Sequence, residues 1–515
     1  MTAAPATPRP LRPLHRDPWL WVLLAVLVAA VPVLLHQGRD QSFFLDEFNF
    51  IVDRRLRAPS TLFAPWYGHW VTLPAVAYRL LLSAFGLRTY LPYQALSIAG
   101  HFAVVVVAWA IARRLGARGW IATVAMVPLV VLGSGRPNIL FGFQITLTAA
   151  LALGLTQLIL ATHDGPWNRR DTAGLACGLV ALMCSGVAVS TTIGVGAAVL
   201  VLRGWRAALA HTAPLAAVYA AWWLLAPDGH ADPEPTFTTD VIRFAFEMAK
   251  NALRGVGGST AAGVAFAALV LLGVLTTLQA SRRHRDRLAV LIGLATVAGS
   301  FALSSGITRA ALHGPEGALE QRYVHVLVAL ALPLAAVGID RLAQMSVLWT
   351  VPALAVLALG LPSNVRALAE GVPPNSLAAF ARSEQLADAD GDRVLHPLIR
   401  IPVSLLQDAA RNPSAWDDVE IAPDAQLQAD LLLTLGQRER ERDTDGCEVV
   451  AERSFRLTPG EPVDFVGNIN VAAIDDGIDV RPVPYAEADG GTLVPSGSLD
   501  VTIEALTPGS GVLDC

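Results

Sequence analysis

The sequence predicts a mainly α-helical protein that crosses a membrane many times and carries a smaller β-rich domain near its C-terminus. Of its 515 residues, 53% are hydrophobic and only 16% are charged, whereas soluble proteins carry about 25% charged residues. About eleven apolar segments lie between residues 18 and 362, and short strand-like runs follow residue 447. This composition excludes an ordinary soluble protein.

Charge is divided unevenly along the chain. Residues 1–362 hold 16 acidic and 27 basic residues, whereas residues 363–515 hold 27 acidic and 11 basic ones. Such an asymmetry indicates two different environments. The basic residues are dispersed between apolar segments, which excludes a nucleic-acid interface. We therefore expect a tail over 1–17, a transmembrane domain over 18–362 and a separate domain over 363–515.

The tail, Met1–Asp17, is rich in Pro and Arg, without apolar periodicity, and is expected to be disordered in the cytoplasm. A helix needs roughly 20 apolar residues to span a bilayer. The first segment has no cleavage site after it and is expected to remain as an anchor. The predicted segments are Pro18–His36, Tyr90–Ala112, Trp120–Gly133, Phe143–Ala161, Thr172–Val189, Thr191–Leu202, Thr212–Ala226, Ala261–Ala280, Leu288–Ser305, Tyr323–Ile339 and Ser346–Leu361.

Arginines predict the orientation, because cytoplasmic loops carry an excess of Lys and Arg. With the tail in the cytoplasm, every inner loop contains arginine, as in the loops that hold Arg113, Arg203 and Arg283. An odd number of spans then places the acidic C-terminal domain outside the cytoplasm. Lys250 is the single lysine, and this bias together with abundant alanine is typical of a GC-rich bacterium, so we expect a bacterial plasma membrane.

The first outer loop, residues 37–89, is long and unusual. Residues 71–86 read as an amphipathic helix that lies along the membrane interface. The loop also carries Arg54, Arg55 and Arg57, and Arg136 and Arg322 lie in later outer loops, against the charge rule. Outward arginines suit an anionic partner at the lipid surface, although nonspecific binding of lipid headgroups explains them equally simply.

The region after residue 447 alternates β-prone runs with Gly, Pro and Asp turns, which predicts a small β-sandwich. Outside the cytoplasm it would suit carbohydrate binding, or it could only cover the membrane domain or dock a partner. Cys447 and Cys515 lie there and are candidates for a disulfide. Cys177 and Cys184 lie in an apolar segment, where thiols usually pack.

Asp46 and Glu47 are the first candidates for chemistry, since they directly follow the first span. Charges at a bilayer boundary are costly unless they face water or a cavity. Such a carboxylate could take a proton from a hydroxyl nucleophile, or the pair could bind a divalent cation. The simpler alternative is a solvated start of a loop or a helix N-cap.

Further candidates lie in the same and later outer loops. Trp66, Tyr67 and Trp70 could stack on a sugar and His69 could bind a phosphate or sugar, or all four could belong to an interfacial aromatic belt. Nucleotide-binding glycine motifs and zinc or EF-hand spacings are absent from the sequence. No cofactor is therefore implied with certainty, although the adjacent acids leave a divalent cation open.

This arrangement resembles the GT-C superfamily of integral-membrane glycosyltransferases over roughly residues 18–345. The resemblance is carried by the topology, the Asp46-Glu47 pair, the segment from Gly135 to Gln144 and the run Glu320-Gln321-Arg322-Tyr323. It implies inverting transfer of a sugar from a polyprenyl-phosphate donor to a hydroxyl of a cell-envelope glycan or lipid.

The resemblance also implies roles for single residues. Asp46 would be the general base and Glu47 its helper. The leaving phosphate would be bound first by Arg322, and then by Arg136, Arg54 and Arg55. Gln144 and Tyr323 would join the aromatic cluster in binding substrate.

Two other classes of function remain open. A lipid transporter or flippase would also be apolar, but it favours ionisable or helix-breaking residues at mid-membrane in related halves, and the sequence has no such halves. A noncatalytic envelope-assembly protein could use the same scaffold and recruit partners through the C-terminal domain.

Overall fold

In the computed structural model, the chain forms two compact units. The first, here the helical unit, comprises Met1–Arg39, Leu56–Ala77 and Leu91–Val372, and the second comprises Asp40–Arg55, Tyr78–Tyr90 and Pro373–Cys515. The structure describes residues 16–39, 41, 43, 47, 50–51, 54, 56, 58–86, 89–226, 238–281, 283–313, 315–369, 394–396, 399–402, 447–458, 461, 463–475, 478–479, 483–493, 499–506 and 509–514. The predicted disordered tail lies almost wholly outside these residues.

Among the described residues, eight helical stretches are long and apolar enough to cross a membrane, which confirms a polytopic membrane protein. All eight coincide with predicted segments. They are α1 (Pro18–Gln37), α5 (Leu91–Leu115), η3 with α8 (Gly142–Gln144 and Ile145–Ala161), α11 (Trp205–Leu225), α13 (Thr260–Ala280), α14 (Arg285–His313), α15 (Gln321–Met345) and α16 with α17 (Val347–Leu359 and Leu361–Ala369).

Shorter helices connect and accompany these stretches. The predicted interfacial helix is α4, and the predicted third, fifth and sixth segments are α6, α9 and α10. The predicted boundary after Val189 is misplaced, because α9 ends at Leu182 and α10 begins at Val187. The bounds are α3 (Pro59–Phe63), α4 (Thr72–Phe85), α6 (Gly119–Val130), η2 (Gly133–Gly135), α7 (Pro137–Leu140), α9 (Arg169–Leu182), α10 (Val187–Arg203) and η4 (Pro315–Leu319).

The longest helix that was not predicted from the sequence is α12 (Thr239–Gly257). Its buried residues include Val241, Phe244, Met248 and Ala252, which recur at intervals of three and four residues and form one face of a helix. Its other faces carry charged residues as well as the exposed Ile242 and Phe246, so the helix contains no continuous apolar segment of membrane-spanning length. The signal was amphipathic periodicity.

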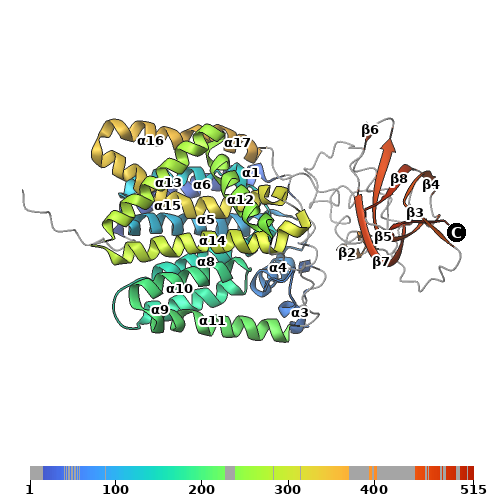
Figure 1. The fold of residues 1–515 in the computed structure, drawn as a ribbon, viewed down its shortest axis with the longest axis horizontal. Helices are drawn as coiled ribbons and strands as arrows, with labels where there is room; N and C mark the ends of the chain where they lie inside the picture. Colours follow the sequence, from blue (N-terminus) through green and yellow to red (C-terminus); the bar gives the residue numbers. More distant parts are fainter. Residues whose placement is uncertain are drawn as a thin grey trace, which may run out of the picture. The chain divides into compact units, whose positions relative to one another are not determined.

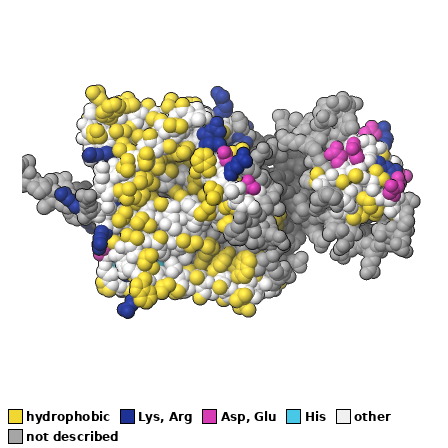
Figure 2. All heavy atoms as spheres, in the orientation of Figure 1, with side chains coloured by type: hydrophobic (Ala, Val, Ile, Leu, Met, Phe, Trp, Pro, Cys, Tyr) yellow, Lys and Arg dark blue, Asp and Glu magenta, His cyan; other side chains and the backbone are white. Residues whose placement is uncertain are grey.

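The centre of the helical unit is α15, whose membrane-length stretch is 78% buried. It packs on α13 at very close range. A Cβ at Gly273 of α13 would lie 1.9 Å from the backbone oxygen of Leu334, and one at Gly338 of α15 would lie 2.2 Å from that of Leu269. Small residues allow helix backbones to approach in this way in membranes. Figure 1 shows the long helices side by side, and Figure 2 shows apolar side chains over much of the visible helical surface.

The C-terminal part is β-rich from Glu448, as predicted. Seven strands form one sheet in the order β3-β9-β5-β8-β4, with β6 and β7 also paired to the long strand β5, and all these pairs are antiparallel. A separate pair joins β1 (Val394–His396) and β2 (Ile399–Pro402). The sheet consists of β3 (Glu448–Val450), β4 (Glu452–Leu457), β5 (Val463–Asp475), β6 (Ile478–Asp479), β7 (Val483–Leu493), β8 (Leu499–Ala505) and β9 (Gly511–Asp514).

Candidate functional site

Glu47 of the second unit is fully buried and its carboxylate is held by two tyrosines. The hydroxyl of Tyr78 donates to Oε1 at 2.5 Å and that of Tyr90 donates to the same atom at 2.8 Å. Phe43 packs edge-on against Tyr90 with ring centroids 5.1 Å apart. A carboxylate enclosed in this way is better suited to positioning neighbouring residues than to reacting with a substrate. Asp46, the predicted base, and Arg55 lie outside the described residues.

Arg54 belongs to the same stretch and is described. Its side chain is only 4% exposed. The guanidinium is therefore enclosed by protein in this structure, and its predicted contact with a donor phosphate stays a prediction.

A tight hairpin shapes the aromatic cluster of the helical unit. Trp66 and His69 exchange two backbone hydrogen bonds of 2.9 and 2.8 Å, and the residues between them, Tyr67 and Gly68, have φ angles of 43° and 72°. Two central residues with positive φ are typical of a type I′ turn. Tyrosine is unfavourable in that conformation, and such strain concentrates at functional sites. The turn leaves the Tyr67 side chain 54% exposed.

Trp70, by contrast, is enclosed within the helical unit. Its ring stacks on Trp222 at 5.2 Å with an interplanar angle of 3°. The indole N–H donates to Thr72 Oγ1 at 2.7 Å, and that hydroxyl donates to the backbone oxygen of Leu62. Both the ring face and the donor are engaged by protein, so the geometry favours packing over binding a sugar.

His69 lies where three distant parts of the chain meet. Its imidazole sits against Gly186, which precedes α10, since a Cβ there would lie 2.7 Å from Nδ1. Burial, and then the charges of Arg309 and Arg322, together lower the pKa of His69 from 6.5 to about 4. The imidazole is therefore neutral at neutral pH, beside two cations.

Arg322 opens the first turn of α15 and has a weakly engaged guanidinium. Its nearest carboxylate oxygen among the described residues belongs to Glu320, at 3.9 Å from Nε. The guanidinium lies over the ring of Tyr323 at 5.3 Å, and the side chain is 33% exposed. The Tyr323 ring itself is buried between Phe244 and Phe301. The Arg322 guanidinium is therefore accessible to an anion, and the Tyr323 ring packs against it.

The segment from Gly133 to Gln144 braces this region. Asn138 is fully buried in α7 and donates to the backbone oxygen of Arg322 at 2.9 Å. Arg136 donates instead to the backbone oxygen of Ala367 in α17, also at 2.9 Å. Gln144 is 7% exposed at the start of α8. These contacts fix the backbone of Arg322 and engage Arg136 in the scaffold.

Sequence reasoning missed Arg309 and a buried histidine pair. Arg309 lies in the last turns of α14, beyond the predicted span, and is a further arginine on the side assigned to outer loops. His101 of α5 and His325 of α15 are fully buried with ring nitrogens 2.9 Å apart. His325 follows Arg322 by one helical turn. A polar residue within each of two apolar spans was the available signal.

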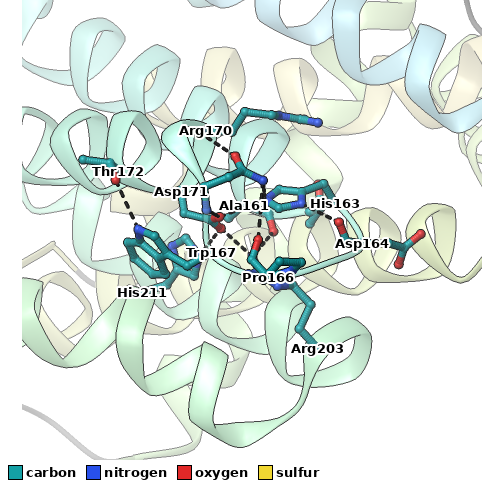
Figure 3. Close-up of polar contacts among 12 residues, drawn as sticks. Ala161, His163, Asp164, Pro166, Trp167, Arg170, Asp171, Thr172, Arg203 and His211 are labelled. Atoms are coloured by element: carbon teal, nitrogen blue, oxygen red, sulfur yellow. Dashed lines mark hydrogen bonds and ion pairs between the residues drawn. The ribbon is translucent and has the colours of Figure 1, made fainter.

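A second polar cluster, built around Asp171, was also missed (Figure 3). Asp171 is fully buried near the start of α9, where it completes a capping box with Asn168. Arg203 donates to its carboxylate, as does His211 at 2.9 Å, and His163 lies at 3.0 Å. Burial alone would raise the pKa of Asp171, but these hydrogen bonds outweigh it and hold the pKa well below its usual value. The cluster joins α9, α10 and α11.

Cys447 is disulfide-bonded, and Cys177 and Cys184 are free. Cys515 lies outside the described residues, so the pairing of Cys447 with Cys515 remains a prediction. Within the described ranges, no group of three or more His, Cys, Asp or Glu could hold a metal ion. A site that uses Asp46 falls outside that search.

Comparison with solved structures shows a similar fold. The chain is similar to the crystal structure of ArnT from Cupriavidus metallidurans in the apo state, with 14% identity and a TM-score of 0.46, over 86% of this chain and 93% of that one. No model of a protein family matches the sequence, and no curated protein matches it. A likeness of this degree assigns no activity to the chain.

Proposed function

We propose that the chain is a GT-C-type glycosyltransferase that moves a sugar from a polyprenyl-phosphate donor to a hydroxyl of a cell-envelope glycan or lipid. The observation that carries the proposal is the cationic group formed by Arg309 and Arg322 beside the neutral imidazole of His69. Among the described residues, no carboxylate closer than the 3.9 Å contact from Glu320 engages Arg322. Two guanidinium groups, of which Arg322 makes only a long ion pair, suit a phosphate.

The reaction assigns each group a step. Asp46 accepts the proton of the acceptor hydroxyl while that oxygen bonds to the anomeric carbon of the donor sugar. The bond between the anomeric carbon and the phosphate oxygen breaks, and the bond electrons leave with polyprenyl phosphate. Arg322 and Arg309 stabilise the charge that develops on the leaving phosphate. Attack opposite the leaving group inverts the anomeric centre.

The surrounding residues position these groups. Glu47 is held by Tyr78 and Tyr90, which supports an orienting part for it beside Asp46. His69, as a neutral imidazole, donates one hydrogen bond to a phosphate or sugar oxygen. The exposed ring of Tyr67 offers a face to a sugar. The C-terminal β-rich domain is assigned to holding the glycan acceptor.

A transfer assay with the purified full chain tests the proposal. Defined polyprenyl-phosphate sugars are supplied with envelope glycan or lipid acceptors, and the product is detected by mass spectrometry. Asp46→Asn is expected to abolish transfer while it leaves membrane insertion intact. Asp240→Asn is the matched control, because Asp240 is an exposed acid at the start of α12. Wild-type rates in Asp46→Asn would remove that residue from the mechanism.

The assay also separates the other classes of function. A flippase would move labelled donor lipid across vesicles without forming a glycosidic bond. A noncatalytic assembly protein would show neither activity with any donor. Either result with a folded protein would contradict the proposed transfer.

A further inference from the structure

A cavity of about 550 Å³ lies at the ends of α5, α13, α14 and α15 and is lined by basic side chains. Arg283, His284, Arg287 and Arg341 contribute to its wall. Arg287 and Arg309 both belong to α14, and 22 residues of α-helix between them correspond to about 33 Å. The cavity is therefore remote from the Arg309 and Arg322 group and forms no part of the proposed active site.

The cavity has an excess of positive charge. Among the described residues, the only acid in its wall is Asp340. That carboxylate is already engaged, since Arg118 Nε lies 2.5 Å from Oδ1 and Gln344 Nε2 donates to Oδ2 at 2.5 Å. Among the described residues, no carboxylate forms an ion pair with Arg283, Arg287 or Arg341. Three guanidinium groups thus line one cavity with no described partner of opposite charge.

One of these guanidinium groups packs closely against the backbone. Gly116, just after α5, has a φ of 107°, and a Cβ there would lie 2.4 Å from Nη1 of Arg287. Only glycine allows this close approach and this conformation. Arg287 is therefore held against the end of α5, whereas Arg283 and Arg341 are exposed.

The wall of the cavity also includes apolar side chains. Leu115 and Val337 line it together with the hydroxyl-bearing Thr276 and Thr277. The Thr276 and Thr277 hydroxyls donate to backbone oxygens of their own helix, at 2.8 Å in both cases. Their methyl groups and the aliphatic side chains can contact hydrocarbon, while the arginines lie at the helix ends. Headgroup and chain of an amphiphile would both find partners here.

We propose that this cavity binds a phosphate-bearing anion, with an anionic phospholipid headgroup as the class that fits it best. Guanidinium forks match phosphate oxygens with paired hydrogen bonds. The arginine distribution assigns this end of the helices to the cytoplasmic side, where anionic lipids attract basic segments near the surface. Free phosphate shares the chemistry, and the experiment separates the two sources.

Binding is measured on the purified full chain in nanodiscs or detergent by native mass spectrometry. Dioctanoyl phosphatidylglycerol is titrated against dioctanoyl phosphatidylcholine, and inorganic phosphate is titrated separately. We expect phosphatidylglycerol to bind at least about tenfold more tightly than the zwitterionic lipid, which carries no net charge. Binding that is equal for the two lipids, and no binding of phosphate, would overturn the proposal.

The double variant R283Q/R341Q removes the two exposed cations and leaves the packed Arg287 untouched. Its affinity for phosphatidylglycerol is expected to fall by about tenfold or more, with an unchanged melting temperature in the absence of lipid. The control is R206Q, which removes an exposed arginine that lies over the Trp205 ring and outside the cavity. Unchanged affinity in the double variant, or an equal loss in R206Q, would overturn the proposal.

Inorganic phosphate decides the source. Displacement of phosphatidylglycerol only at phosphate concentrations far above that of the lipid assigns the cavity to lipid headgroups. Tight binding of phosphate without binding of phosphatidylglycerol keeps the phosphate chemistry but assigns the cavity to a soluble anion. The single variant R287Q should lose either ligand, which provides a second measurement if the double variant folds poorly.

Discussion

The two ends of α10 show opposite ways of handling buried or half-buried charge. At the start of the helix, Gly186 packs against His69, and the charges of Arg309 and Arg322 act on the His69 imidazole. At its end, Arg203 joins His211 and His163 around the carboxylate of Asp171. At the start of α10, two arginines lie near a neutral imidazole. At its end, the buried carboxylate of Asp171 accepts hydrogen bonds from an arginine and two histidines.

The difference distinguishes a structural cluster around Asp171 from a candidate binding site around His69. The Asp171 group is fully buried and charge-balanced, so it has little to offer a ligand and much to offer the packing of α9, α10 and α11. The His69 group keeps its positive charge, which costs stability unless an anion arrives. We infer that the arginines near His69 are retained because they bind an anion. Four measurements would break or sharpen this contrast.

The largest effect is expected from Asp171→Asn. The change leaves Arg203 buried without a counter-charge, and such a loss typically costs about 3–5 kcal/mol of stability. Thermal unfolding in detergent should show a large drop, with transfer per folded molecule unchanged. Asp240→Asn, at an exposed position, should change little. An equally small change of the melting temperature in Asp171→Asn would contradict a structural role of the Asp171 cluster.

Arg322→Gln is expected to reverse this pattern. Loss of one group that stabilises the leaving charge lowers the rate by about 10²–10³-fold. Stability should change little, because the Arg322 side chain is 33% exposed and its 3.9 Å ion pair with Glu320 is long. The turnover number and the melting temperature are measured together. Arg136→Gln serves as the comparison, because Arg136 binds a backbone oxygen and should lose stability before activity. Full activity in Arg322→Gln would exclude it from donor binding.

Gly186→Ala tests the position of His69. The added methyl group would lie 2.7 Å from Nδ1, so the imidazole must move. Displacements of this size cost about tenfold to a hundredfold in rate, and we expect that range in the transfer assay. Gly299→Ala in α14 is the control, since nothing lies within 4 Å of a Cβ there. Equal rates in both variants would place His69 outside the site.

The pH dependence should be the smallest effect. His69 has a pKa of about 4 in the folded protein against 6.5 in the unfolded chain. The unfolded chain therefore binds more protons between these values, and stability falls as pH decreases from about 6.5 toward 4. Thermal unfolding of His69→Gln should lose this acid-side decline. A decline of unchanged size would mean that His69 is protonated normally.

Much of the membrane part could be predicted from the sequence because hydropathy is a local property. Eleven predicted segments coincide with helices, and eight are of membrane-spanning length in the described residues. The amphipathic α12 was missed because its apolar residues are spaced along one face. Arg322 was chosen because it lies in the predicted outer loop just before the tenth span, where a guanidinium group could bind a phosphate. Arg309 lies in the same predicted loop and was not considered.

Partnerships between distant residues could not be predicted. Arg203 was counted as one more inner-loop charge, yet it pairs with Asp171, 32 residues away, because α9 and α10 are packed together. Trp66, Tyr67 and Trp70 look equivalent in the sequence, but only packing shows that Trp70 stacks on Trp222 while Tyr67 is exposed. The sequence alone does not show which aromatic rings are covered by other parts of the protein.

The sequence by itself determined that this chain spans a membrane, which helices do so, and that a β-rich domain follows. These properties depend on apolar length and strand periodicity, which neighbouring residues specify. Only the tertiary structure decided which charges are neutralised and which remain open. That outcome depends on helices far apart in the chain, since the state of His69 follows from burial and from arginines on α14 and α15.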